Sequence, residues 1–157
     1  MLIKLLGGTL LAVSGCLAAV MLRLYHKRRI ETLDGLISLI LFIKGQVDCY
    51  ARPIGEILSS IPKEILRDCG VTVIPESLSD VTDGARIYLD EECLRLFTSF
   101  AAEFGKSFRE EQVRRCDHYI AALGERRMGY ETKALAQGRA GGAICVCVSL
   151  CLLILLW

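Results

Sequence analysis

Residues 30–50 read IETLDGLISLILFIKGQVDCY, and this stretch indicates the fold class. Its apolar residues recur every three or four positions, which is the spacing of a helix with one buried face. They are Ile30, Leu33, Leu36, Ile37, Ile40, Ile43, Val47 and Tyr50. No proline separates this pattern from the residues before it, so we expect one long helix that continues from the N-terminal part of the chain through residues 23–29.

Two uncharged stretches lie at the ends of the chain, residues 5–22 and residues 140–157, each 18 residues long. A helix of this length measures about 27 Å, close to the roughly 30 Å hydrocarbon thickness of a bilayer. We therefore expect an N-terminal transmembrane helix within residues 1–22, a C-terminal one at 140–157, and a single domain at 23–139 between them.

The charged residues are concentrated in that central domain. The chain has 157 residues, of which 53% are hydrophobic and 24% are charged. All of its 19 Lys and Arg except Lys4, and all of its 18 Asp and Glu, lie in residues 23–139, which are therefore neutral overall. Neutrality excludes a nucleic-acid binder that relies on bulk positive charge, and the high apolar content excludes a disordered tail protein.

Basic residues border the inner end of each uncharged stretch. They are Arg23, Lys27, Arg28 and Arg29 on one side, and Arg126, Arg127, Lys133 and Arg139 on the other. By the positive-inside rule, the domain lies in the cytoplasm and the protein crosses the cell membrane twice. A cleaved signal peptide is the alternative for the first stretch, although its basic residues follow the apolar run instead of preceding it. A buried core helix is the alternative for the second.

Small residues form a ridge along the first uncharged stretch. Gly8, Ala12, Gly15 and Ala19 recur at steps of four and three, a spacing that lets membrane helices pack closely. Ordinary small-residue content of a membrane helix is the alternative explanation. Gly138 and Gly142 have the Gly-x-x-x-Gly spacing, and together with Gly141 they are a candidate hinge before the second stretch.

The rest of the domain also has the pattern of an all-α protein. Proline precedes two short predicted helices, residues 54–60 and 63–68, and Gly70 follows the second. We expect a loop at 71–84, a helix at 86–104 ended by Gly105, and a last long helix capped by Ser107 and Glu110. The predicted fold is a cytoplasmic bundle built on an antiparallel pair of long helices, set between two transmembrane helices.

The sequence contains no recognisable catalytic, metal or cofactor motif. Four of the eight cysteines lie in the uncharged stretches, and the other four, Cys49, Cys69, Cys93 and Cys116, are widely spaced. We expect packing cysteines, no metal, no cofactor and no enzymatic activity. A membrane-bound enzyme that uses a cysteine or an aspartate is the weaker alternative.

The order of features resembles the stage III sporulation protein AB family of endospore-forming bacteria. The resemblance lies in the helix with Arg29, Leu33, Leu36, Ile40, Ile43 and Tyr50, in RPIGEIL at residues 52–58, in FGKSFREEQ at 104–112, and in the anchors at both ends. It covers essentially the whole chain. The chain departs from the family at Phe108, where members usually have an aspartate.

The resemblance implies a non-enzymatic scaffold in the secretion-like complex that joins mother cell and forespore during engulfment. Members are similar to the inner-membrane platform proteins of type II secretion and type IV pilus machines. The implied location is the mother-cell membrane facing the forespore. The implied partners are a cytoplasmic ATPase similar to stage III sporulation protein AA and other membrane subunits of the same complex.

A polar surface on the last long helix and on the loop is the candidate contact with that ATPase. Its residues are Glu76, Asp80, Asp83, Arg109, Glu110, Gln112, Arg114 and Arg115. The alternative is that these side chains are merely solvated. Two other functions also remain open, a two-pass sensor with a helical bundle and an adaptor subunit of another secretion or pilus platform.

Overall fold

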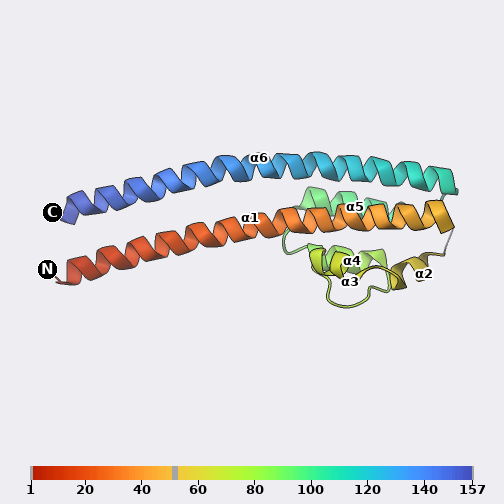
Figure 1. Cartoon of the computed structure of the whole chain (residues 1–157), viewed down its shortest axis with the longest axis horizontal. Coiled ribbons are helices and arrows are strands. Elements are labelled where there is room, and N and C mark those ends of the chain that lie inside the picture. Colours follow the sequence, from red (N-terminus) through yellow and green to blue (C-terminus); the bar gives the residue numbers. More distant parts are fainter. Residues whose placement is uncertain (1, 51–52, 157) are drawn as a thin grey trace. The chain divides into compact units, whose positions relative to one another are not determined.

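A computed structural model of the chain describes the backbone of residues 2–50 and 53–156, and within them the side chains of residues 7, 13–50, 53–134 and 148. The described residues form helices and connecting turns without a β-strand, which confirms the all-α prediction. The helices are α1 (Leu2–Tyr50), α2 (Ile54–Ser59), α3 (Lys63–Asp68), α4 (Leu78–Ala85), α5 (Glu91–Glu103) and α6 (Arg109–Leu156), shown in Figure 1.

The chain divides into two compact units. Unit 1 contains residues 1–27 and 130–157, and unit 2 contains residues 28–129. Within the described residues, no helix is both long and apolar enough to cross a bilayer. Most of the predicted span at 140–157, and the predicted packing residues Gly8 and Ala12, lie outside the residues whose side chains are described.

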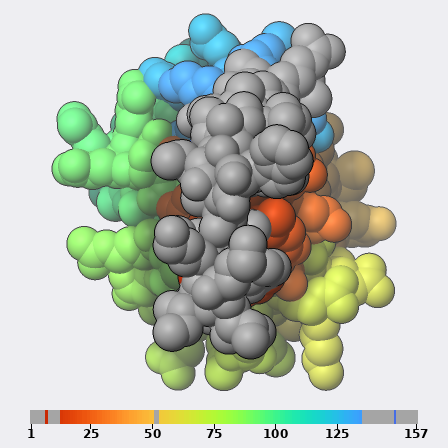
Figure 2. Space-filling model, turned by 90° about the vertical axis from the view of Figure 1, so that its left-hand side faces the viewer, coloured from red at the N-terminus to blue at the C-terminus, as the bar shows by residue number. Residues whose placement is uncertain are grey.

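In unit 2, the second half of α1 is the central element of the core. The two views agree that α6 lies on one side of this part of α1, and that α2, α3 and α4 lie on the opposite side (Figures 1 and 2). Leu33, Leu36, Leu39 and Ile40 are 0% exposed, as expected for a helix covered on more than one face. The surrounding helices contribute Ile57, Leu66, Val81, Phe97, Phe100, Cys116 and Leu123 to the same core.

Three ion pairs set α1 and α6 in antiparallel register. Asp34 pairs with Arg127, Lys44 pairs with Asp117 at 2.6 Å, and Asp48 pairs with Arg109 at 3.0 Å. The partner's number on α6 falls as the number on α1 rises, so the two helices run in opposite directions. The charge that α1 contributes also alternates in sign along the helix, because α1 supplies the acid in the first and third pairs and the base in the second.

The first two short helices form where the sequence predicts them. Pro53 precedes α2, and Pro62 precedes α3. Gly70, just beyond α3, has a φ of 82°, which permits the left-handed turn that closes the helix. The N–H groups of Gly70 and Val71 donate to the carbonyls of Arg67 and Leu66 at 3.0 and 2.8 Å.

The expected loop at 71–84 is wrong in its second half, because α4 occupies Leu78–Ala85. Ser77 starts this helix with a capping box, in which its own N–H donates to the carboxylate of Asp80 at 3.0 Å. Leu78, Val81 and Ala85 share one face of the helix and are buried against the unit. Pro75, Ser77, Ser79 and the pair Asp83-Gly84 made this segment look like a turn region, but the cap and the buried face make its second half helical.

Helix α5 starts five residues later than predicted and ends one residue earlier. The helix starts at Glu91 and not at residue 86, because the side chain of Asp90 accepts a hydrogen bond from the N–H of Cys93 at 3.1 Å and so caps it. The helix ends at Glu103, and Gly105 follows with a φ of 82°. The predicted stop at Gly105 is therefore confirmed.

The start of α6 also differs from the expected cap. The helix begins at Arg109, which places Phe108 at the cap position instead of Ser107. The Gln112 N–H donates to the Phe108 carbonyl at 2.9 Å, and the Gln112 side chain donates to the Ser107 carbonyl at 2.6 Å. Ser107 thus contributes its backbone to this turn, and the capping box with Glu110 is not the cap that the helix uses. The backbone of α6 stays helical through 138–142, where a hinge was expected.

Gly35 allows α1 and α3 to pack with their backbones close together. A Cβ atom at this position would lie 2.8 Å from the backbone carbon of Asp68 and 2.9 Å from the backbone nitrogen of Cys69. A Cβ atom at Gly45, on the same helix, would meet nothing within 4 Å. Only the first glycine is therefore required by packing.

We expect Gly35→Ala to destabilise the protein by about 1–3 kcal/mol, because the backbone of α3 must move away from the new methyl group. Gly45→Ala is the matched control and should be neutral or stabilising by up to about 1 kcal/mol, because alanine favours helix. Urea unfolding followed by circular dichroism measures both. Equal stability of the two variants would contradict the close contact between α1 and α3.

Candidate partner-binding surface

The structure divides the predicted contact residues into two groups. Glu76, Asp80 and Asp83 lie in or just before α4. The other five, Arg109, Glu110, Gln112, Arg114 and Arg115, lie in the first two turns of α6. Because α4 and α6 are on opposite sides of α1 in Figures 1 and 2, the two groups do not form one continuous surface.

In the α4 group, Asp80 has a local structural role. Its carboxylate accepts hydrogen bonds from the N–H groups of Ser77 and Glu76, at 3.0 and 2.9 Å. The bond from the Ser77 backbone is the main cause that lowers the pKa of Asp80 below its ordinary value. Asp80 therefore holds the start of α4, while Glu76 and Asp83 are exposed.

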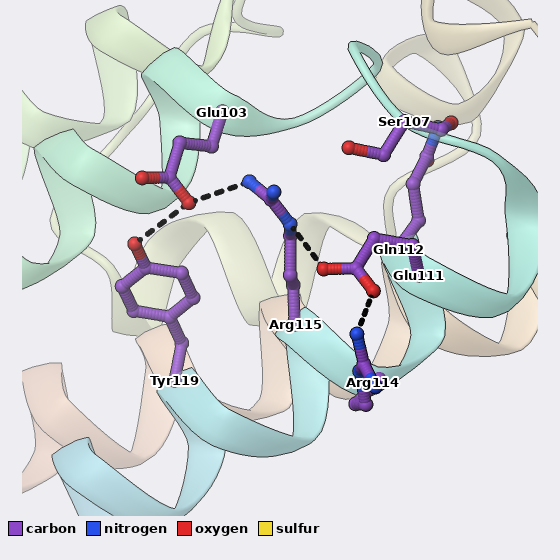
Figure 3. A network of polar contacts seen from close by, with 7 residues as sticks. All are labelled: Glu103, Ser107, Glu111, Gln112, Arg114, Arg115 and Tyr119. Atoms are coloured by element: carbon purple, nitrogen blue, oxygen red, sulfur yellow. Dashed lines mark hydrogen bonds and ion pairs between the residues drawn. The ribbon is translucent and has the colours of Figure 1, made fainter.

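In the α6 group, Arg115 joins α6 to α5. Its guanidinium donates to Glu111 at 3.0 Å and to Glu103 at 2.8 Å (Figure 3). The hydroxyl of the buried Tyr119 donates to the same Glu103 carboxylate at 3.2 Å, and Arg114 pairs with Glu111. The charges in this network balance, so it connects helices and does not present a strong field of one sign.

The network also changes the acidity of its members. The hydrogen bond from Arg115 is the largest cause that lowers the pKa of Glu111, with a smaller contribution from Arg114. Burial is the main cause that raises the pKa of the Tyr119 hydroxyl, and the charge of Glu103 adds to it. Both shifts favour the protonation states that keep the network bonded near neutral pH.

Phe108 is the least expected residue of this region. Its side chain is 91% exposed, at the position where α6 begins. It borders a hollow of about 620 Å³ that is also lined by Asp48, Arg109, Glu110 and Val113. In the sequence, Phe108 stood out only as a departure from a family pattern. Its exposure could not be read from the sequence, because it depends on where the turn between α5 and α6 lies.

A second hollow, of about 370 Å³, lies beside the first, and we call it the groove. Its lining residues come from the end of α1, from α2 and from the turn into α6: Val47, Pro53, Ile54, Ile57, Phe104, Gly105, Arg109 and Gln112. Arg109 lines both hollows and donates to the side chain of Asp48 at 3.0 Å. This end of unit 2 therefore combines an exposed aromatic ring, a groove of mixed polarity and a partly exposed guanidinium.

Three of the four cysteines of unit 2 are buried. Cys69, Cys93 and Cys116 are buried free thiols, and burial raises the pKa of Cys69 to about 12 and that of Cys116 to about 11. Cys49 is exposed at the end of α1. Among the described residues, no three His, Cys, Asp or Glu side chains come close enough together to hold a metal ion.

Comparisons of the chain with protein-family models, with curated proteins and with solved structures found no match.

The lowered pKa of Glu111 predicts a pH dependence. A carboxylate whose pKa is lower in the folded state stabilises that state above its unfolded value, near 4.5, and the contribution is lost as the pH falls through the folded value. Glu111→Gln should therefore be less stable than wild type at pH 7, and the difference should shrink below about pH 4.5. Thermal unfolding between pH 7 and 3 measures it.

Glu110→Gln is the control for this experiment, since Glu110 is a neighbouring exposed carboxylate without an ion pair among the described residues. Because Glu110→Gln leaves the bond between Arg115 and Glu111 in place, it should not reproduce the pH dependence of Glu111→Gln. A pH dependence that is the same for both variants would contradict the role of Arg115 as the partner of Glu111.

Proposed function

We propose that the chain is a non-enzymatic, two-pass membrane scaffold whose cytoplasmic bundle docks a soluble ATPase in a sporulation secretion-like complex. The observation that carries this proposal is the set of three ion pairs that hold α1 and α6 in antiparallel register. Such a pair, with the short helices packed against it, gives a rigid body suited to holding a partner in place.

The sequence supports the membrane part of the proposal. Residues 5–22 and 140–156 of the uncharged stretches belong to α1 and α6, the two helices that form this pair in unit 2. The basic residues that border both stretches favour a cytoplasmic location for the residues between them. In this proposal, α1 and α6 each continue from an anchor into the domain that meets soluble proteins.

The sporulation part rests on the resemblance to the stage III sporulation protein AB family. That resemblance supports a place in the mother-cell membrane facing the forespore, with an ATPase similar to stage III sporulation protein AA as the partner. The exposed ring of Phe108 supports a protein contact at the start of α6, because exposed aromatic side chains are frequent anchors of interfaces.

Cys49 provides a test of location that needs no engineered residue. A membrane-impermeant maleimide should label Cys49 only after the cells are permeabilised, because its exposed thiol is expected on the cytoplasmic side. The buried Cys69 is the internal control and should stay unlabelled until the protein is denatured. Labelling of Cys49 in intact cells would place the bundle outside and favour the sensor alternative.

Binding to the ATPase tests the partner. The full-length chain in nanodiscs should bind the purified ATPase, and Phe108→Ser should weaken binding by about tenfold or more, as expected for the loss of an aromatic anchor. Ile87→Ser is the matched control, since Ile87 is 72% exposed in the turn between α4 and α5. Failure of the wild-type chain to bind would reject the ATPase as partner.

A further inference from the structure

The groove has walls of mixed polarity, and one of the residues that line it is charged. Ile54, which is 39% exposed, and the half-buried Phe104 supply its apolar surface, whereas Val47 and Ile57 are buried. Of the residues that line it in the described part of the chain, Arg109 alone carries a charge. The carboxylates of Asp48 and Glu110 line the neighbouring hollow instead.

Arg109 keeps donors available toward a ligand. Both bonds that it makes to described residues, to the carbonyl and to the carboxylate of Asp48, come from Nη2. A guanidinium has five N–H donors, so those on Nε and Nη1 remain for an incoming acceptor. Its side chain is 58% exposed, which keeps these donors accessible.

The walls of the groove are held in place before any partner arrives. A Cβ atom on Gly105 would lie 2.5 Å from Cδ1 of Ile54, so the turn between α5 and α6 rests directly on α2. The Gln112 side chain closes the same turn through its bond to the Ser107 carbonyl. A preformed groove binds with a smaller loss of conformational entropy than a mobile one.

We propose that the groove binds a segment of a partner protein that presents one large apolar side chain next to a carboxylate. The apolar side chain contacts Ile54 and Phe104, and the carboxylate accepts hydrogen bonds from Arg109. A carboxylate suits the groove because it can accept hydrogen bonds from Nε and Nη1 of Arg109 while Asp48 keeps its bonds from Nη2. The inference rests on the proposed function and specifies the chemistry of its docking site.

A library of displayed random peptides tests the groove without any assumption about the natural partner. The peptide library is panned on the wild-type chain in nanodiscs, and peptides that also bind the Ile54→Asp variant are removed by counter-selection. The expected result is enrichment of peptides that have Asp or Glu within a few residues of Leu, Ile, Phe or Trp. Enrichment of basic or purely apolar peptides, or no enrichment over Ile54→Asp, would overturn the proposal.

Two substitutions of opposite charge at residue 54 separate the effect of charge on binding from the effect of losing the isoleucine side chain. Ile54→Asp and Ile54→Lys both remove the isoleucine, but only the aspartate repels a carboxylate, so Ile54→Asp should bind an enriched peptide about tenfold more weakly than Ile54→Lys. Ile87→Asp, elsewhere on unit 2, should bind like wild type. Equal binding by the two Ile54 variants would contradict the acidic part of the ligand.

Melting temperatures of the variants show whether they fold. If either charged variant unfolds, Ile54→Ala replaces both and should still weaken peptide binding, and wild-type affinity in that variant would overturn the proposal. ATPase binding by the wild-type chain is measured separately. If the chain selects peptides but does not bind the ATPase, the groove is supported and the proposed partner is rejected. If ATPase binding is unchanged in all Ile54 variants, the partner is supported and the groove is rejected as its docking site.

Discussion

Burial of α1 within unit 2 is the constraint on which the other elements depend. Leu33, Leu36, Leu39 and Ile40 are completely removed from solvent, and no single neighbouring helix covers all of their faces. Helix α6 covers one side, and the short helices α2 to α4 cover the other (Figures 1 and 2). Each fully buried leucine or isoleucine stabilises the fold by about 1.5–3 kcal/mol, so the apolar core, and not the polar network, provides most of the stability.

The ion pairs have a different role, because they determine alignment more than stability. Partly exposed pairs usually contribute less than about 1 kcal/mol each. The alternating signs of Asp34–Arg127, Lys44–Asp117 and Asp48–Arg109 nevertheless oppose a shift of one helix along the other, because a shifted register would separate these partners or bring like charges together. The same register brings the start of α6 beside the end of α1, where the groove lies.

Local patterns in the sequence predicted most of the helices. The apolar period of residues 30–50, the prolines before α2 and α3, and the glycines after α3 and α5 act within a few residues, so they are readable without the fold. α4 was missed because Ser77 and Asp80 match both a turn and a helix cap, and only burial of Val81 decides between them. The groove and the partners of Arg109 and Arg115 depend on segments far apart in the sequence, which local patterns do not report.

The bond from Arg109 to the backbone carbonyl of Asp48 also has a consequence for how the end of α1 forms. The last turn of α1 has no basic residue of its own, although a cation there is favourable to the negative end of the helix dipole. The cation is supplied from 61 positions further along the chain. Arg109 therefore brings a favourable charge to this terminus only once α6 has packed beside α1.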